Sequence, residues 1–376
     1  MASPPRMSKG LDDVLVGRSS ISWVGGETGD LVYRGFDVRD IVPGVPYESV
    51  VHLLLFGEPP SADPSREVGR ELGARRTVPP SIERVVDALP AGLPPLEALR
   101  TILSSLGTGS YGYPPTREEG FDLIARTPVL LARYVRRSRG LPPVPPRADL
   151  GHAANLLWML FGQLPEPRHV AALEGYLDLL ADHGMNASTF ALCVAISTQS
   201  DLVSAATAAL ATLKGPVHGG APSRVSDMLD AIGSADRAEP WIRERLARKE
   251  VLYGFGHRAY KTDDPRGLVL HAIAKTVADP HRLALAEAVE STALAALRRE
   301  KPGARLFTNV EYYSAVVLEG VGMPRELFTP TFAVARTAGW TAHALEQAAD
   351  NRLIRPDVEY VGPPKGRTWP RPLPGH

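Results

Sequence analysis

Residues 188–213 read STFALCVAISTQSDLVSAATAALATL, a stretch rich in alanine, serine and threonine with only scattered large apolar side chains. Small side chains allow the backbones of packed helices to approach each other closely. We therefore expect one or two deeply buried helices here. Because helical patterns also dominate the rest of the chain, the fold class that the sequence predicts is all-α.

Helical patterns continue on both sides of this stretch. Apolar residues recur at helical spacing between breaks that contain proline or glycine, which is typical of amphipathic helices. The expected helices span residues 47–56, 64–75, 81–89, 95–107, 119–138, 151–162, 167–184, 222–232, 238–249, 265–278, 281–299, 309–321 and 328–350. Pro222 occupies a favourable first position of the helix that it opens.

Three segments depart from the helical pattern. Residues 21–24 and 30–34 flank the sequence GGETG, which predicts a small β-hairpin with a glycine-rich turn. Residues 141–147 read LPPVPPR, a stiff connector and the best linker candidate in the first half of the chain. The final residues, 363–376, are rich in proline, and we expect them to be disordered.

The bulk composition excludes several classes of protein. A length of 376 residues accommodates two domains, or one large domain with an insertion. Lysine plus arginine and aspartate plus glutamate both number 42, so nothing suggests a nucleic-acid or acidic-membrane partner. The single cysteine, Cys193, fits a small core residue in a reducing compartment. Because the chain has no apolar leader and no run of about 20 apolar residues, we expect a soluble cytoplasmic protein.

Two histidines lie in glycine-containing loops just ahead of expected helix starts, His218 in GPVHGG and His257 in GFGHR. The positive potential at a helix N-terminus disfavours an imidazolium ion. We therefore expect His218 to be neutral and to donate a hydrogen bond, as a histidine that polarises a carbonyl does. Arg258, Lys261 and Arg266 cluster around His257, which suits an anionic ligand.

A carboxylate and three further residues complete the candidate site. Glu311 lies in the sequence NVEYY, where apolar and aromatic neighbours should raise its pKa and suit it to act as a general base. His183 is either a helix-end cap or a ligand contact, and Arg336 and Arg355 are single arginines on late, otherwise apolar stretches. Each residue alone has an ordinary structural explanation. Together, two imidazoles and one carboxylate on separate loops are the groups needed for acid–base chemistry at a carbon centre.

In this order, the motifs resemble those of the citrate synthase family, from about residue 17 to residue 362. The matching segments are YRGFD at 33–37, ADHGMNAST at 181–189, GPVHGG at 215–220, residues 254–266, NVEYYS at 309–314 and RTAGW at 336–340. The resemblance implies an all-helical homodimer. It also implies a large domain of residues 1–220 and 323–376, a small domain of residues 221–322, and an active site in the cleft between them that closes by domain rotation.

The same resemblance implies roles for the candidate residues. His218 would hydrogen-bond the thioester carbonyl of acetyl-CoA while Glu311 takes the methyl proton, and the resulting enol would attack the ketone of oxaloacetate. His257 would protonate the new alkoxide, and water would then hydrolyse the citryl-CoA thioester. Arg258 and Lys261 resemble the residues that meet the phosphates of CoA.

The remaining candidates resemble ligands of oxaloacetate. His183, Arg266 and Arg336 look like contacts made within one subunit, and Arg355 resembles the arginine contributed across the dimer interface. The resemblance implies no metal and no tightly bound cofactor, because the acyl-CoA is a co-substrate.

Position 311 departs from the family, in which the base is usually aspartate. Glu311 is one methylene longer, and a displacement of about 1 Å costs roughly 10²-fold in rate unless the backbone compensates. We expect compensation, because every other role is filled. Leu180, Gly184 and Cys193 also differ from common family residues, and these differences bear on substrate choice and rate more than on fold.

Several hypotheses stay open at this point. A 2-methylcitrate synthase would use the same residues with propionyl-CoA, and a non-catalytic relative would bind CoA or oxaloacetate as a sensor. A metal hydrolase built on His183, His218 and His257 is disfavoured, because no HExxH or CxxC spacing supports it. A phosphate-binding loop is also disfavoured, because residues 25–29 lack the Lys-Ser/Thr pair and a following helix.

Overall fold

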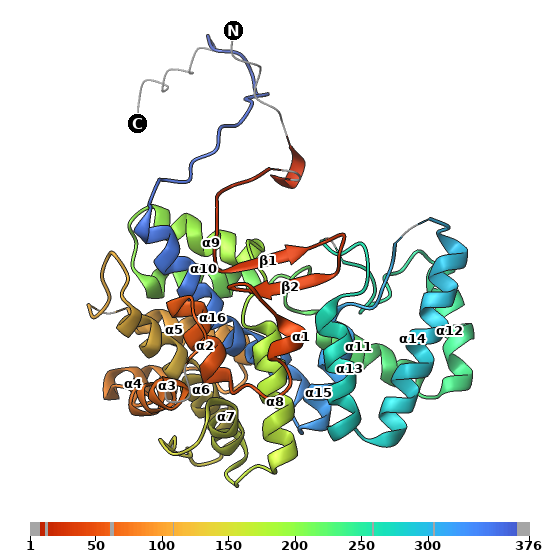
Figure 1. The fold of residues 1–376 in the computed structure, drawn as a ribbon, viewed down its shortest axis with the longest axis horizontal. Helices are drawn as coiled ribbons and strands as arrows, with labels where there is room; N and C mark the ends of the chain where they lie inside the picture. Colours follow the sequence, from red (N-terminus) through yellow and green to blue (C-terminus); the bar gives the residue numbers. More distant parts are fainter. Residues whose placement is uncertain are drawn as a thin grey trace, which may run out of the picture.

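The computed structural model describes residues 8–11, 14–60, 64–107, 109–257, 259–303 and 305–366. These parts of the chain form sixteen α-helices, three short 3-10 helices and one small antiparallel sheet (Figure 1). The all-α class that the sequence predicts is confirmed. None of the helices in these parts combines the length and the apolar character needed to cross a bilayer.

The observed helices follow the predicted ones closely. The α-helices are α1 (Val38–Ile41), α2 (Tyr47–Phe56), α3 (Pro64–Ala74), α4 (Pro80–Ala88), α5 (Pro95–Ser105), α6 (Arg117–Ser138), α7 (His152–Phe161), α8 (Pro167–Leu180), α9 (Ala187–Ser197), α10 (Leu202–Leu213), α11 (Ala221–Ile232), α12 (Ala238–Ala247), α13 (Pro265–Val277), α14 (Pro280–Glu300), α15 (Val310–Gly320) and α16 (Phe328–Ala349). The 3-10 helices are η1 (Lys9–Leu11), η2 (Ala235–Arg237) and η3 (Arg325–Leu327). The main difference is α8, which ends four residues before the predicted end.

The small-residue stretch forms two helices, α9 and α10, that pack on each other and on α16. Asp201 separates them, because its side chain accepts a hydrogen bond from the Ser204 backbone N–H at 2.9 Å and caps α10. Cys193 is 2% exposed and is a free cysteine, in agreement with its expected place in the core.

The N-terminal hairpin is confirmed and gains a third strand. The strands β1 (Ser22–Gly25), β2 (Asp30–Tyr33) and β3 (Phe36–Asp37) form one antiparallel sheet. The sequence missed β3 and α1, because two and four residues are too few to show a period. The turn of the hairpin packs on the loop that follows His257: the Lys261 N–H donates to Gly26 O at 2.8 Å.

Helix α16 occupies the centre of the larger group of helices. Every residue from Phe328 to Ala344 except Thr329 is buried, and the helix contacts α2, α6, α8, α9 and α10. Gly339 approaches residues 181–182 so closely that a Cβ atom there would lie 2.4 Å from Ala181 O. The Gly339 N–H donates to this same oxygen at 3.1 Å. A side chain at position 339 is therefore excluded.

Helices α11 to α14 gather on one side of the hairpin, while α2 to α7, α9 and α10 lie on the other (Figure 1). Helix α8 lies between the two groups and contacts α13 and α15. The division into domains of residues 1–220 with 323–376 and of residues 221–322 stays a prediction.

Two proline-rich segments have different surroundings. Residues 141–147 connect α6 to α7 and are fastened to these helices, because Trp158 Nε1 donates to Pro145 O at 2.9 Å and Arg136 Nε donates to Pro142 O at 2.6 Å. The C-terminal segment leaves α16 as an extended chain that runs away from the helices (Figure 1). The expected disorder of residues 363–376 falls largely on 367–376, which lie outside the described residues.

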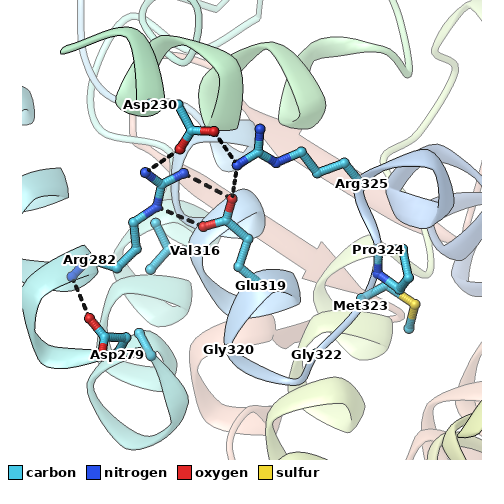
Figure 2. Close-up of a pocket in the computed structure, with 11 residues that line it drawn as sticks. Asp230, Asp279, Arg282, Val316, Glu319, Gly320, Gly322, Met323, Pro324 and Arg325 are labelled. Carbon is cyan, nitrogen blue, oxygen red and sulfur yellow. Dashed lines mark hydrogen bonds and ion pairs between the residues drawn. The ribbon is translucent and has the colours of Figure 1, made fainter. Parts of the chain in front are cut away.

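Four charged side chains form a closed ring where α15 meets η3 (Figure 2). Arg282 pairs with Glu319 at 2.7 Å and with Asp230 at 2.9 Å. Arg325 pairs with the same two carboxylates, at 3.3 Å and 2.6 Å. The ring joins α11, α14, α15 and η3, and it borders a cavity of about 520 Å³. The side chains of Arg282 and Glu319 are only 17% and 20% exposed, so solvent screens their pair weakly.

Replacing Glu319 by glutamine tests the contribution of this ring. The variant removes the carboxylate that Arg282 and Arg325 share on α15, so we expect the free energy of unfolding to fall by about 1–2 kcal/mol at low salt. Urea denaturation monitored by circular dichroism measures this change. The matched control is Glu239→Gln, which removes an exposed partner of Arg243, and we expect it to change stability by less than about 0.5 kcal/mol. Equal losses in the two variants would contradict a special role for the ring.

Candidate functional site

The loops that carry His257 and Glu311 are paired through their backbones. The Gly256 N–H donates to Phe307 O at 2.7 Å, and the Asn309 N–H donates to Gly254 O at 2.9 Å. Asn309 also uses its side chain, because Nδ2 donates to Gly256 O at 2.9 Å. These bonds fix the two predicted catalytic loops relative to each other.

His257 and His183 lie side by side, with 5.4 Å between their ring centroids. His257 Nδ1 accepts hydrogen bonds from the Ala259 and Tyr260 N–H groups at 3.0 and 3.1 Å. Nδ1 therefore holds a lone pair, and the ring proton of neutral His257 resides on Nε2. Tyr260 also reaches the second histidine, because its hydroxyl lies 3.3 Å from His183 Nε2.

His218 is held by the first turn of α9. Its Nε2 atom lies 2.9 Å from Ser188 Oγ, and its ring meets the ring of Phe332 edge to face. The Ser188 hydroxyl has a second acceptor in reach, Asn186 Oδ1 at 2.8 Å. When the hydroxyl donates to Nε2, the proton of neutral His218 resides on Nδ1 and is available to a ligand.

The three rings are neutral near pH 7. Burial lowers the pKa of His218 to about 4, with a smaller contribution from the charge of Arg336. Burial and the charge of Arg266 lower the pKa of His257 to about 4 in the same way. Burial, Arg266 and His257 hold the pKa of His183 well below its usual value. Neutrality agrees with the expectation for His218, but its main cause is burial and not the nearby helix N-terminus.

Glu311 is the second residue of α15, and its N–H donates to the capping side chain of Asn309 at 3.2 Å. Its Oε2 atom is buried and has no hydrogen-bond partner among the described residues. Burial raises the pKa of Glu311, and the nearby charge of Arg266 opposes this shift. A buried carboxylate with a spare oxygen is well suited to accept a proton.

The two arginines of the site differ in what they can bind. Arg336 is 1% exposed; its Nε donates to Leu180 O at 2.8 Å, while its Nη2 is buried without a partner among the described residues. Arg266 is 3% exposed and forms a two-pronged pair with Asp264, at 3.0 and 2.8 Å. Arg336 therefore presents an unsatisfied donor to an anion, whereas Asp264 already occupies two nitrogens of Arg266.

Two other predicted ligands, Lys261 and Arg355, have exposed side chains. Lys261 is exposed, and its charge contributes to the lowered pKa of His257 after burial and the charge of Arg266. Arg355 lies on the extended C-terminal segment, where its side chain is 75% exposed and pairs with Asp357 at 3.1 Å. Arg258 falls outside the described residues. Within one chain, the structure thus brings together the three histidines, Glu311, Arg266 and Arg336, but not Arg355.

Sequence reasoning missed the support behind His183. Asp182 is fully buried and accepts hydrogen bonds from the Gly184 N–H at 2.9 Å and from the Ser22 hydroxyl, and it faces His343 Nε2 at 3.2 Å. Burial acts to raise the pKa of Asp182, but His343, Arg336 and these hydrogen bonds lower it to about 2. The one signal in the sequence was the position of Asp182 directly before His183.

No group of three histidine, cysteine, aspartate or glutamate side chains in the described parts of the chain is arranged to hold a metal ion. The cavity beside the ion ring contains none of the predicted site residues.

Comparisons with known proteins point to one family. Residues 10–357 match the family described as Citrate synthase, C-terminal domain. The chain is 41% identical over 375 residues to the citrate synthase of Mycolicibacterium smegmatis, covering 96% of both chains. It is 38% identical to the 2-methylcitrate synthase of Mycobacterium tuberculosis, covering 95% of this chain and 91% of the relative. The fold also resembles that of citrate synthase from Thermoplasma acidophilum, solved as a ternary complex with carboxymethyl coenzyme A and oxaloacetate. The two structures superimpose with a TM-score of 0.90 at 30% sequence identity, and the match covers 97% of this chain and 99% of the other.

The lowered pKa values predict how stability depends on pH. Between pH 6.5 and about 4, unfolded histidines bind protons while His218 and His257 in the folded protein do not. Their contribution to stability is therefore fully present above pH 6.5 and is lost as the pH falls toward 4. We expect the Tm of the wild type to fall more steeply over this range than that of a His218→Asn/His257→Asn double variant, as measured by calorimetry.

His281 supplies the matched control, because it is exposed on the first turn of α14. The His281→Asn variant should follow the wild-type curve. Parallel curves for the wild type and the double variant would show that the two buried rings do not cause the acid sensitivity.

Proposed function

The chain belongs to the citrate synthase family, and we propose that it condenses acetyl-CoA with oxaloacetate and hydrolyses the product to citrate and CoA. One observation carries the proposal: two buried atoms of opposite charge, Glu311 Oε2 and Arg336 Nη2, have no hydrogen-bond partner among the described residues and accompany the candidate histidines. Buried polar groups in proteins usually have a partner, so these two atoms favour ligand groups as theirs. Three neutral histidines accompany them.

A dicarboxylate such as oxaloacetate suits the arginine side of the site. Arg336 Nη2 can bind one carboxylate, and the low exposure of the guanidinium makes this charge-assisted bond strong. Arg266 adds positive potential, although Asp264 neutralises part of it. His183, held by the Tyr260 hydroxyl, can donate to a further oxygen of the substrate.

The carbon–carbon bond requires a base, a carbonyl donor and a proton donor. Glu311, whose pKa burial raises, would take a proton from the methyl group of acetyl-CoA while His218 stabilises the enol oxygen through a hydrogen bond. The enol carbon then attacks the ketone carbon of oxaloacetate. His257, with its proton on Nε2, would donate to the ketone oxygen as it becomes an alkoxide. Water finally cleaves the thioester and releases CoA.

The second candidate function is that of a 2-methylcitrate synthase. The M. tuberculosis relative of that name is 38% identical over nearly the whole chain, close to the 41% of the M. smegmatis citrate synthase. Propionyl-CoA would use the same base and the same histidines, because it differs only by one methyl group on the reacting carbon. A difference of one methyl group is worth only about 1–3 kcal/mol in selectivity.

The assay that tests the proposal measures CoA release from each acyl-CoA in the presence of oxaloacetate. We expect acetyl-CoA to give the higher kcat/KM. Replacing Glu311 by glutamine should lower kcat by about 10²–10⁴-fold with either donor, because glutamine cannot accept the proton. Glu300→Gln, at the exposed C-terminal end of α14, is the control and should keep the wild-type rate.

The outcomes separate the three hypotheses. A strong preference for propionyl-CoA would replace the first proposal by the second. Oxaloacetate binding in calorimetry without CoA release from either donor would support a non-catalytic sensor. An unchanged rate in Glu311→Gln would remove Glu311 from the mechanism.

We also propose that the active form is a homodimer in which Arg355 serves the site of the other subunit. Arg355 is remote from the other candidates within its own chain, on a segment whose apolar side chains are exposed. Leu353, Val358 and Val361 are 56%, 91% and 87% exposed, and such a run of exposed apolar groups favours an interface.

Mixing two inactive variants tests this assignment. Glu311→Gln subunits keep Arg355, and Arg355→Ala subunits keep Glu311, so a mixed dimer holds one complete site only if Arg355 acts across the interface. We expect random re-association of equal amounts to restore about one quarter of the wild-type activity. The absence of restoration in dimers shown to be mixed by mass spectrometry would place Arg355 in its own subunit's site, whereas an Arg355→Ala variant with wild-type activity would place it outside any site.

A further inference from the structure

We propose that Glu290 is a positioning residue that holds the loops of His257 and Glu311 together as one rigid unit. Its effect on turnover rests on the proposed function, whereas its effect on the two loops does not. Glu290 belongs to α14, lies outside every motif that the sequence singled out, and is half-buried.

Both oxygens of Glu290 are used. Oε1 accepts a hydrogen bond from the Thr308 hydroxyl, and Oε2 accepts one from the Tyr313 hydroxyl, each at 2.5 Å. These distances are typical of strong hydrogen bonds between a hydroxyl and a charged carboxylate. The two donors lie on either side of Glu311 in the sequence. One carboxylate therefore clamps the chain before and after the proposed base.

The same clamp extends to the His257 loop through Thr308. The backbone of Thr308 forms an isolated antiparallel bridge with Phe255, two residues before His257. On either side of this bridge, the Gly256 N–H donates to Phe307 O and the Asn309 N–H donates to Gly254 O. A shift of Thr308 toward or away from Glu290 would consequently move both loops.

Aromatic packing fixes the remaining side of the unit to the same helix. The Tyr312 hydroxyl donates to Ala286 O at 2.7 Å, one turn before Glu290 on α14. The Phe255 ring packs on Tyr312, with ring centroids 5.1 Å apart. Gly254 has a φ of +88°, and a Cβ atom there would lie 2.5 Å from the Tyr312 ring, so the loop has little room to shift. Glu290 thus attaches the Thr308 to Tyr313 segment to α14 through hydrogen bonds, and Tyr312 attaches the same segment to α14 and packs on Phe255.

No hydrogen bond or ion pair joins Glu290 to His257 or Glu311 in the described parts of the chain, so its influence is geometric. A displacement of about 1 Å between base and substrate costs roughly 10²-fold in rate. Removing the Glu290 carboxylate leaves two hydroxyl groups without their acceptor and frees the segment that they hold. Proton abstraction by Glu311 should suffer most, because its side chain lies between the two clamped residues.

Glu290→Ala tests the proposal with three measurements. We expect kcat to fall by about 10–100-fold, and the isotope effect on kcat with an acyl-CoA deuterated on the α carbon to rise, because proton abstraction becomes more nearly rate-limiting. We also expect amide hydrogen exchange, followed by mass spectrometry, to speed up in peptides that cover residues 254–257 and 308–313 together. A loss of stability alone would raise neither the isotope effect nor exchange in these two loops selectively.

The matched control is Glu300→Ala, at the exposed C-terminal end of the same helix. It should leave kcat, the isotope effect and exchange in both loops at wild-type values. Thr308→Val and Tyr313→Phe each remove one hydroxyl and keep the carboxylate, so they test the clamp even if Glu290→Ala does not fold. Glu290→Gln keeps one acceptor oxygen and should retain more activity than Glu290→Ala.

Different results would overturn the role of Glu290 and the proposed function. A folded Glu290→Ala variant with wild-type kcat and isotope effect would overturn the proposal, as would faster exchange in one loop but not the other. If Glu290→Ala does not fold, wild-type values in both single-hydroxyl variants would overturn it as well. A wild type that releases no CoA from either donor would defeat the proposed function, while the exchange measurements would still decide whether Glu290 couples the loops.

Discussion

The close contact between α16 and residues 181–182 is the constraint on which the site depends. Gly339 lets the helix backbone touch the loop directly, and the Gly339 N–H adds a hydrogen bond at 3.1 Å. One turn earlier on the same helix, Arg336 donates to Leu180 O, so the arginine and the His183 loop share a single support. Asp182 makes a further contact between the loop and α16, because its carboxylate lies 3.2 Å from Nε2 of His343 on that helix. The helix thereby sets the distance between a cation and a histidine that would bind the same substrate.

The charges of the site follow one electrostatic pattern. Arginine and glutamate keep unsatisfied atoms, whereas the histidines lose their charge because burial disfavours imidazolium. Neutral rings can donate hydrogen bonds to a carbonyl without attracting the carboxylate of Glu311 or repelling the arginines. The Asp264–Arg266 pair, 1% and 3% exposed, keeps a second arginine beside the site at a reduced local charge. The site is thus prepared for an anionic ligand without an excess of positive charge.

The sequence predicted the helices well, but it did not predict the contacts that the candidate residues make. Helical spacing located nearly every helix, because amphipathic patterns are local properties of the chain. The two short elements β3 and α1 escaped, since two and four residues are too few to show a repeating pattern. The partners of the site residues escaped for another reason: Leu180 lies 156 positions from Arg336, and Ser188 lies 30 positions from His218. The pairing of Asp264 with Arg266 escaped as well, although these two residues are only two positions apart.

The N-terminal hairpin has a consequence for the order in which this chain folds. Its residues are synthesised before their partners: the Ser22 hydroxyl donates to Asp182, and the Gly26 carbonyl accepts from Lys261. Just before the hairpin, the Ser20 N–H donates to Glu346, 326 positions away. Contacts of such long sequence separation form slowly, because a large loop must close before they contribute. The hairpin region can therefore complete these contacts only after residue 346 has been synthesised.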